Sequence, residues 1–176
     1  MLLKGKRVAV LVAEQYQDLE VWYPVLRLRE EGARVVIVGT GSASEYKGKF
    51  GYPIKADTAA DKAKSSDFDA VVIPGGWAPD FLRRYRSVCR FVSDMNREKK
   101  VVAAICHAGS VLVSAGILKG RTATAFKAVK DDMVYAGANF VDREVVRDGN
   151  LITSRTPDDL PAFMREIISA LQKRSK

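Results

Sequence analysis

Short apolar segments alternate with helix-like segments along this chain, and that alternation restricts its fold more than any other feature of the sequence. Strands that are covered on both faces in a parallel sheet are nearly continuous apolar, β-branched runs, whereas half-buried helices repeat apolar residues at helical spacing. Runs of the first kind lie at residues 7–13, 34–39, 70–74 and 101–105, and segments of the second kind lie at residues 18–31 and 87–99. Such alternation forms βαβ units. We therefore expect an α/β protein, a flavodoxin-like three-layer α/β/α sandwich with a mostly parallel sheet.

The remaining segments predict smaller elements around this sheet. Residues 47–54, which contain two glycines and a proline, predict a short hairpin or an excursion at a sheet edge. Further along the chain we expect a hairpin over residues 138–146 and 150–154, joined through an Asp-Gly turn, and helices over residues 107–115 and 157–173. The sequence has no internal repeat and no low-complexity linker. We therefore expect residues 1–176 to form a single domain.

The chain is basic, with a formal net charge of +8 from 29 Lys and Arg residues against 21 Asp and Glu residues. These charges are scattered and are not interleaved with aromatic residues, as a nucleic-acid surface would require. The densest groups, residues 83–86 and the tail at residues 173–176, are expected to be solvated. No apolar run approaches the roughly 20 residues that span a bilayer. We expect a cytoplasmic protein with no membrane partner and no specific nucleic-acid partner, in which the first apolar run is a strand and not a signal peptide.

The chain has two cysteines, Cys89 and Cys106, and a single histidine, His107. Two thiols do not indicate a disulfide framework, and this set is a poor match to the ligands of a zinc site. We therefore expect no metal and no cofactor. Cys89 lies inside an expected helix, where a structural role is the simplest interpretation.

Cys106 ends an apolar strand, and His107 begins the next helix, so the connection between the two elements has essentially no length. A turn of this kind presents its side chain at the carboxyl edge of the sheet, where ligands bind. The helix N-terminus would lower the pKa of the thiol, and free N–H groups there and at Gly76 would bind an oxyanion. The alternative is that Cys106 is only a small buried hydrophobic residue. The adjacent Gly75-Gly76 loop favours a functional thiol.

Several short motifs, taken in their order and spacing, resemble one family. They are Asp18-Leu19-Glu20, Pro74-Gly75-Gly76, Ala104-Ile105-Cys106-His107-Ala108 and Ser154-Arg155-Thr156-Pro157-Asp158-Asp159. On these residues the chain resembles the ThiJ/PfpI superfamily, most closely its PfpI-like branch of intracellular proteases and deglycases, over residues 7–166. The resemblance implies the fold of the class I glutamine-amidotransferase-like group.

The resemblance also implies roles for single residues. Cys106 would be the nucleophile, and the Glu20 carboxyl would hydrogen-bond its sulfur. The backbone N–H groups of Gly76 and His107 would form an oxyanion hole. Members of the PfpI branch are oligomeric, which implies a dimer or a hexamer here. In that branch an acid of the neighbouring subunit, matched by Asp80 in this sequence, orients the histidine.

Three more residues, Gly75, Trp77 and Arg155, lie in the same edge loops and are candidates for substrate contact. Packing at a subunit interface is the alternative interpretation of Trp77. Phe126 and Lys127 stand where PfpI relatives have a tyrosine and a proline, so this chain lacks a hydroxyl group at that place.

Elementary chemistry adds two expectations for the side chains around the sulfur. A carboxylate repels a thiolate, so Glu20 is expected to stay protonated, with a raised pKa. Adjacent side chains at a helix start point in different directions, so a direct contact between the Cys106 and His107 side chains is geometrically awkward. No histidine follows His107, and this excludes a glutaminase that completes its triad with a late His-x-Glu.

The sequence therefore predicts a cysteine-dependent hydrolase, an intracellular protease or a deglycase or glyoxalase. Its substrates would be small reactive aldehydes such as methylglyoxal, or glycated proteins and peptides. The physical argument favours the aldehyde chemistry, because a shallow thiol suits small carbonyl compounds, whereas peptide hydrolysis also needs a groove. The alternative is a non-enzymatic redox sensor or stress chaperone that uses the same cysteine.

Overall fold

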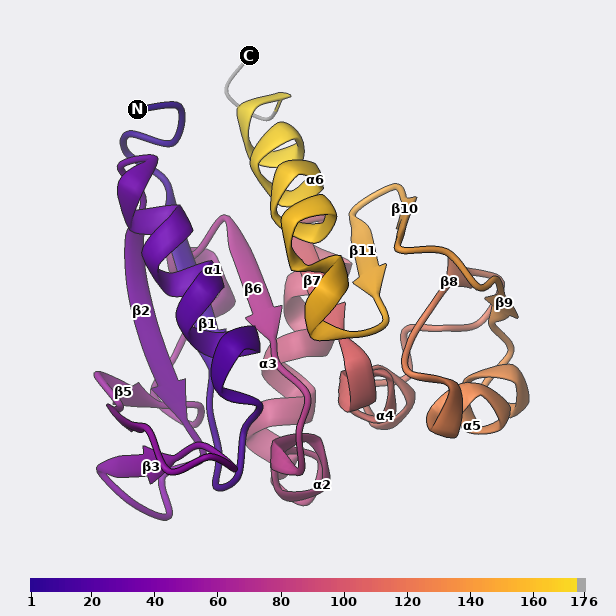
Figure 1. Ribbon diagram of the computed structural model, residues 1–176, viewed down its shortest axis with the longest axis horizontal. Helices are drawn as coiled ribbons and strands as arrows, with labels where there is room; N and C mark the ends of the chain where they lie inside the picture. Colours follow the sequence, from indigo (N-terminus) through magenta and orange to yellow (C-terminus); the bar gives the residue numbers. More distant parts are fainter. Residues whose placement is uncertain (174–176) are drawn as a thin grey trace.

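A seven-stranded sheet forms the centre of the protein, and the structure, a computed structural model, describes residues 1–173 (Figure 1). The strand order is β10-β11-β7-β6-β1-β2-β5. In chain order these strands are β1 (Arg7–Leu11), β2 (Arg34–Gly39), β5 (Thr58–Ala59), β6 (Ala70–Ile73), β7 (Val101–Ile105), β10 (Val145–Asp148) and β11 (Leu151–Ser154). Every neighbouring pair is parallel except β10 with β11. The mostly parallel sheet predicted from the apolar runs is confirmed.

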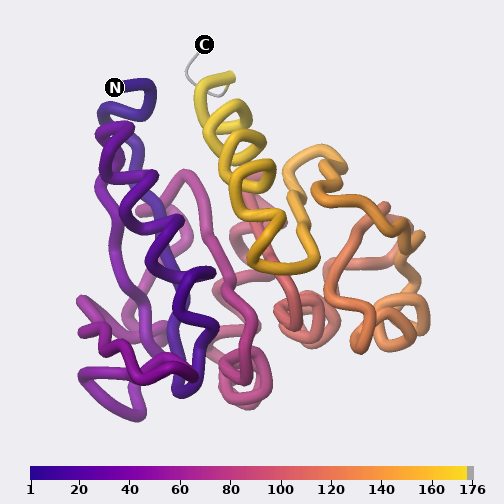
Figure 2. Tube along the Cα trace, viewed as in Figure 1, coloured from indigo at the N-terminus to yellow at the C-terminus, as the bar shows by residue number. Residues whose placement is uncertain are grey.

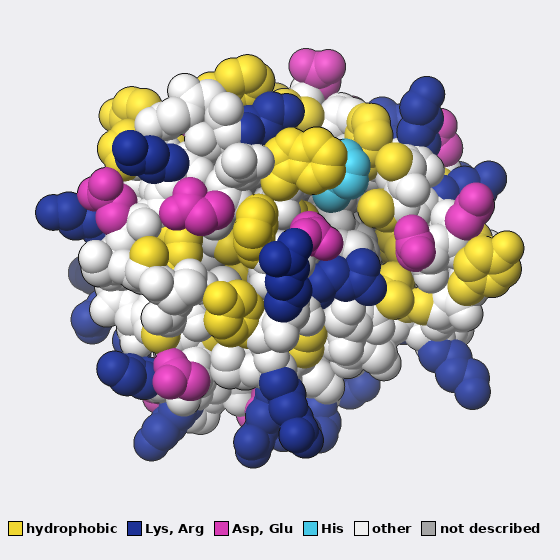
Figure 3. Space-filling view, turned by 90° about the horizontal axis from the view of Figure 1, so that it is seen from below, with side chains coloured by type: hydrophobic (Ala, Val, Ile, Leu, Met, Phe, Trp, Pro, Cys, Tyr) yellow, Lys and Arg dark blue, Asp and Glu magenta, His cyan; other side chains and the backbone are white. Residues whose placement is uncertain are grey.

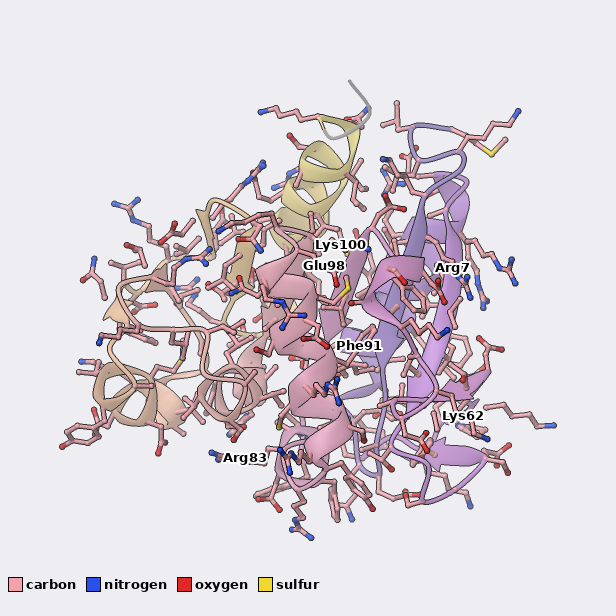
Figure 4. All side chains as sticks on the ribbon, turned by 180° about the vertical axis from the view of Figure 1, so that it is seen from behind. Arg7, Lys62, Arg83, Phe91, Glu98 and Lys100 are labelled. Carbon is pink, nitrogen blue, oxygen red and sulfur yellow. The ribbon has the colours of Figure 1, made fainter. Side chains whose placement is uncertain are left out.

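Helices cover both faces of this sheet. α1 (Asp18–Glu30) and α6 (Leu160–Lys173) contact each other and lie in front of the sheet in Figure 1. α3 (Arg86–Arg97) lies on the opposite face, against β6 and β7, and Figure 4 shows it from behind with Phe91 on it. The Phe91 ring meets the Phe68 ring edge-on at 5.6 Å. The expected three-layer α/β/α arrangement is therefore confirmed.

Whereas the 3₁₀ turn at Ser65–Asp67 precedes β6, most of the smaller elements gather around the carboxyl ends of the strands. Three short helices lie there or nearby: α2 (Ala78–Leu82), α4 (Gly109–Ser114) and α5 (Lys130–Tyr135). Single 3₁₀ turns are η1 (Ser65–Asp67), η2 (Cys106–Ala108), η3 (Lys127–Val129) and η4 (Pro157–Asp159). Figure 2 shows the start of the chain and the end of α6 at one end of the molecule, while the parallel strands run toward the other. Loops and short helices at that second end are free to build a site.

Local sequence explains why the central strands are buried and where α1 begins. Every residue of β6 and β7 is buried, because both strands carry only apolar side chains. The Gln17 side chain caps α1 by accepting the Leu19 N–H at 2.7 Å. Gly32, with φ of 86°, follows the helix in the left-handed conformation that favours glycine. The cap at Gln17 places the first turn of α1, with Glu20, beside the strand ends.

Residues 45–55 form the short hairpin that the sequence predicts over residues 47–54. Its strands, β3 (Glu45–Lys47) and β4 (Pro53–Lys55), are antiparallel. The backbone of Gly48 bridges to Tyr16, and the Lys49 N–H donates to the Tyr16 carbonyl at 2.8 Å. These bonds attach the hairpin to the loop that follows β1.

The predicted continuous strand over residues 138–146 is wrong. Residues 139–140 form β9 (Asn139–Phe140), which pairs in parallel with β8 (Thr122–Ala123) in a separate two-stranded sheet. The chain leaves that sheet before β10, which pairs with β11 as predicted. Asp148 belongs to β10 and not to the turn, because it pairs with Leu151, and its carboxylate accepts the Thr122 N–H at 2.8 Å. The predicted helix over residues 107–115 starts as the 3₁₀ turn η2 and becomes α-helical at Gly109.

Two arginines of the basic segment at residues 83–86 make contacts at the protein surface. Arg83 donates to the Ser114 hydroxyl at 2.9 Å, and Arg84 pairs with Asp80. Of the basic tail, residues 174–176 lie outside the described residues. No helix within residues 1–173 is both long enough and apolar enough to cross a membrane.

Candidate active site

Cys106 lies at the junction of β7 and α4, where the backbone adopts a left-handed conformation. Its φ is 62°, and its side chain is buried, with 8% exposure. A non-glycine residue in this region costs about 1–3 kcal/mol and persists only where the surrounding structure enforces it. Strands β6 and β11 fix β7 as far as Ile105, and the Cys106 carbonyl accepts the Phe126 N–H at 3.1 Å. The sharp strand–helix turn expected from the sequence is therefore present, and it is strained.

Glu20 meets this turn from the first turn of α1. Its side chain is fully buried, and Oε2 accepts the Gly75 N–H at 2.6 Å. The carboxyl group also lies within hydrogen-bonding reach of the Cys106 thiol. Oε1 has no partner of good hydrogen-bonding geometry among the described residues. The proton of a neutral Glu20 would thus be carried by Oε1, because Oε2 already accepts a hydrogen bond.

Gly75 allows three segments of the chain to converge at this point. A Cβ atom at position 75 would lie 2.6 Å from Cys106 Cβ and 2.6 Å from Glu20 Oε2, closer than real Cβ contacts come. Its N–H is occupied by Glu20. The structure therefore places Gly75, a candidate for substrate contact, under the site as a spacer that orients Glu20.

Backbone N–H groups of Gly76 and His107 lie against the Cys106 sulfur. Gly76 has φ of 71°, and a Cβ there would lie 2.4 Å from the Gln17 nitrogen. The flanking backbone is fixed, since the Trp77 N–H donates to the Gln15 carbonyl at 2.9 Å. Two N–H donors that converge beside a nucleophile match the layout of an oxyanion hole.

Burial dominates the proton equilibria of Glu20 and Cys106. It raises the pKa of Glu20 from 4.5 to about 7, and the Gly75 and Cys106 hydrogen bonds oppose this only in part. Burial and the neighbouring Glu20 carboxylate raise the pKa of the Cys106 thiol to about 12, against the lowering effect of the His107 and Gly76 N–H groups. The expected rise at Glu20 agrees with the structure, whereas the expected lowering at Cys106 is wrong. The two groups interact directly and therefore titrate as a pair, in which Glu20 ionises first.

His107 contacts the sulfur directly. Its Nδ1 atom lies 3.3 Å from Cys106 Sγ, so the expectation that this contact is awkward is wrong. The left-handed φ of Cys106 turns its side chain toward the imidazole that follows it. The imidazole is stacked on Phe126 at 4.8 Å between ring centroids, with Trp77 at 6.5 Å. Burial and the positive charge of Lys49 lower the pKa of His107, so the ring is neutral at pH 7.

A cavity of about 300 Å³ opens over the sulfur. Its lining comes from six parts of the chain: Gln17, Lys49, Gly76, Trp77, Cys106, His107, Phe126, Thr156 and Pro157. Figure 3 shows this end of the molecule, with the chain's one histidine side chain (cyan) at the surface among hydrophobic side chains (yellow). Of the predicted site residues, Gly76, Trp77, Cys106 and His107 line the cavity, and Glu20 and Gly75 lie beneath it.

Lys49 and Thr156 line this cavity but were not predicted as site residues. Lys49 lies in the hairpin, whose position depends on backbone bonds to Tyr16 that a local pattern does not reveal. Thr156 lies in the loop after β11, which the sequence places at the correct edge. Phe126 was singled out only for its missing hydroxyl, yet its ring supports His107.

Two predicted residues lie outside the cavity. Asp80 is exposed on α2 and pairs with Arg84, and within residues 1–173 it makes no contact with His107 of its own chain. Arg155 is held by Asp159 at 2.9 Å and by Asp142 at 2.7 Å, which raises its pKa. It lines a neighbouring cavity of about 530 Å³ that shares Phe126 and Thr156 with the first.

The hairpin that carries Lys49 is attached to α1 by Asp18. This carboxylate accepts the N–H groups of Phe50 at 3.0 Å and Tyr52 at 3.2 Å. We expect Asp18→Ala to lower the free energy of unfolding by about 1–2 kcal/mol, because both hydrogen bonds are lost. Hydrogen exchange at residues 48–52 is expected to accelerate more than elsewhere. Asp61→Ala, at an exposed aspartate, is the control, and equal exchange in both variants would contradict this role.

No group of three or more His, Cys, Asp or Glu side chains within residues 1–173 is arranged to hold a metal ion. Cys89 lies half-buried on α3, where burial raises the pKa of its thiol. The other thiol lies at a strand–helix turn with a buried carboxyl group, an imidazole and two N–H donors around it. These features define a protein of the α/β class with a candidate nucleophilic cysteine at the carboxyl edge of a parallel sheet.

Comparison with known proteins identifies the family. The DJ-1/PfpI family matches residues 6–170, and the chain belongs to this family. A deglycase of Pyrococcus abyssi is 43% identical over 166 residues, which cover 94% of this chain and 99% of the relative. The deglycase PfpI of Pyrococcus furiosus is 42% identical over 166 residues, with the same coverage of both chains. The resemblance to the PfpI branch is thereby confirmed.

Solved structures support the same assignment. The crystal structure of a two-domain protein from Anabaena variabilis, with DJ-1/ThiJ/PfpI-like and ferritin-like domains, superposes with a TM-score of 0.93 at 44% identity. The match covers 95% of this chain and 48% of that protein.

Proposed function

We propose that this chain is a cysteine-dependent hydrolase that acts on methylglyoxal and on its adducts with proteins, as a single domain in the cytoplasm. The observation that carries the proposal is the contact of the Cys106 thiol with the Glu20 carboxyl group, His107 Nδ1 and two backbone N–H groups at the base of a small cavity. Deglycases that are 42% to 43% identical over nearly the whole chain support the same reaction.

The Glu20 carboxylate supplies the first step as a proton acceptor. The Glu20 carboxylate accepts the thiol proton while Sγ forms a bond to the aldehyde carbon of methylglyoxal. The carbonyl oxygen takes the negative charge between the Gly76 and His107 N–H groups, and then receives the proton. With an adduct on a protein amine, the carbon–nitrogen bond breaks as the carbon–sulfur bond forms, and the thiol proton leaves with the amine.

His107 supplies the second step. Its Nδ1 atom, unprotonated in the tautomer that carries the proton on Nε2, removes the proton from the former aldehyde carbon and returns it to the neighbouring carbon. The hydroxyl proton of the former aldehyde oxygen moves to the neighbouring ketone oxygen in the same step, through an enediol. This converts the hemithioacetal into a thioester of lactic acid. Water then cleaves the carbon–sulfur bond, which releases lactate and restores the thiol. Overall, methylglyoxal and water become lactate and a proton.

The cavity favours this chemistry over peptide hydrolysis and over redox sensing. A volume of about 300 Å³ accommodates a small carbonyl compound or the tip of a modified side chain, but not an extended peptide. Burial of Cys106 limits the access of oxidants to its thiol, which disfavours selective oxidation.

We also propose that the active form is a homo-oligomer. Within residues 1–173, the His107 ring has no carboxylate partner that would orient it. The carboxylate of Asp80 from a neighbouring subunit would supply one, as the resemblance to the PfpI branch implies. Trp77, which is 62% exposed beside the cavity, would then be covered at the interface.

The proposed function is tested by lactate release from methylglyoxal and from a methylglyoxal-treated peptide, with casein cleavage measured on the same preparation. We expect lactate from both aldehyde substrates and only trace cleavage of casein. Cys89→Ser is the control for the second thiol and is expected to retain activity within about twofold, because Cys89 lies on α3, away from the cavity. Turnover of casein without lactate release would replace the proposal with a protease.

A further inference from the structure

Lys49 brings an unneutralised positive charge to the active-site cavity. It lines the cavity together with Cys106 and His107, and its charge lowers the pKa of Glu20 and of His107. Its Nζ atom lies 5.1 Å from the centre of the Phe50 ring, and no carboxylate among the described residues forms an ion pair with it. The charge is therefore available to a ligand.

The acidic residues near Lys49 in the fold are occupied by backbone groups. Asp18 accepts the Phe50 and Tyr52 N–H groups, and Glu14 lies against the Lys47 N–H at 3.4 Å. Gly48 allows Asp18 to approach this closely, since a Cβ there would lie 2.2 Å from Asp18 Oδ1. The same bonds that fix the hairpin thus leave Lys49 without an acidic partner.

The rest of the cavity carries no charge that would compete with Lys49. Its other side chains are aromatic, apolar or neutral and polar, and the His107 ring is neutral at pH 7. The side-chain amide oxygen of Gln17 is already used, because it accepts the Leu19 N–H as the cap of α1. The lining of the cavity therefore presents one fixed charge to a ligand, the positive charge of Lys49, while the Glu20 carboxyl group lies beneath the sulfur.

We propose that Lys49 makes this site selective for carbonyl substrates that carry an anionic group, a carboxylate or a phosphate ester, within a few atoms of the reactive carbonyl carbon. The anionic group binds the ammonium group while the carbonyl carbon meets Sγ. A partly exposed ion pair of this kind changes affinity by about fivefold. The inference depends on the proposed function only where turnover is measured.

The direct test uses two alkylating reagents that differ in charge and very little in size. Iodoacetate is anionic and iodoacetamide is neutral, and both transfer a two-carbon group to the Cys106 sulfur with loss of iodide. The readout is the ratio of the two rates, followed at Cys106 by mass spectrometry of the peptide. Because both reagents need the same thiolate, any effect of Lys49 on the thiol pKa cancels in the ratio.

We expect Lys49→Gln to lower the iodoacetate-to-iodoacetamide ratio by about fivefold, and Lys49→Arg to preserve it. Lys47→Gln removes the same charge from the same hairpin outside the cavity and is expected to leave the ratio unchanged. An unchanged ratio in Lys49→Gln, or an equal fall in Lys47→Gln, would overturn the proposal. Neither result depends on whether the protein turns over methylglyoxal.

Turnover of charged and neutral α-oxoaldehydes then shows whether the site prefers a carboxylate or a phosphate ester. Dioxovalerate, an α-oxoaldehyde with a terminal carboxylate, is compared with butylglyoxal, a neutral one of similar length, and with the phosphate ester of hydroxymethylglyoxal. We expect kcat/KM for one or both anionic substrates to fall about fivefold in Lys49→Gln while butylglyoxal is unaffected. Equal falls for all three would overturn the selectivity. Failure of the wild type on every α-oxoaldehyde would reject the proposed function, while the alkylation ratio still decides the role of Lys49.

Discussion

Replacing Cys106 with serine is expected to reduce lactate release from methylglyoxal by about 1,000-fold or more. A hydroxyl group is far less acidic than a thiol, and the same burial that raises the pKa of Cys106 opposes ionisation of an alcohol still more strongly. Glu20, with a pKa of about 7, is too weak a base to compensate.

The serine variant should retain its fold, so the loss can be assigned to chemistry. Serine has the same single γ atom and tolerates the φ of 62° as well as cysteine does. We expect its melting temperature to lie within a few degrees of that of the wild type, as for other isosteric substitutions. Activity of Cys106→Ser above a tenth of the wild-type rate would show that another group is the nucleophile.

Glu20→Gln is expected to remove a pH dependence of stability worth about 3 kcal/mol. The folded protein binds the Glu20 proton more tightly than the unfolded chain does, since burial raises the pKa from 4.5 to about 7. This stabilisation is fully present below pH 4.5 and is lost as the pH rises through about 7. A glutamine cannot ionise, and its carbonyl oxygen can still accept the Gly75 N–H.

The measurement is chemical denaturation of wild type and variant at pH 5 and at pH 8. The variant should gain about 2.5 kcal/mol relative to the wild type between the two conditions, while its activity falls because the thiol has lost its proton acceptor. Glu45→Gln, at an exposed glutamate on β3, controls for the loss of a carboxylate. A wild-type pH dependence that persists in Glu20→Gln would place the titrating group elsewhere.

The sequence predicts the sheet well because each central strand is a local pattern. The fully apolar segments of β6 and β7 are buried on both faces, and no other element type suits such short runs. The strands within residues 139–148 are not predicted correctly, because their boundaries depend on pairing partners that are distant in sequence. β9 pairs with β8, and Asp148 binds Thr122.

The sequence predicts which site residues lie at the ends of strands, but it does not predict the contacts between their side chains. The ends of β6 and β7 bring Gly76 and Cys106 together at one edge, as the sequence suggests. The contact of His107 with Cys106 depends on a left-handed φ that the tertiary structure imposes. The raised pKa of the thiol depends on burial and on Glu20, which a helix-dipole argument alone does not include. Lys49 reaches the site through backbone bonds to Tyr16.

The left-handed backbone at Cys106 also restricts which nucleophiles evolution can place in this fold. With φ at 62°, a β-branched side chain would be a severe outlier, whereas an unbranched one is tolerated at modest cost. Threonine, which serves as a nucleophile in other hydrolases, is therefore closed to this lineage unless the strand–helix junction is rebuilt. Only cysteine or serine can therefore supply the reactive atom at this position. New substrate specificities have to arise from changes in the loops around the cavity.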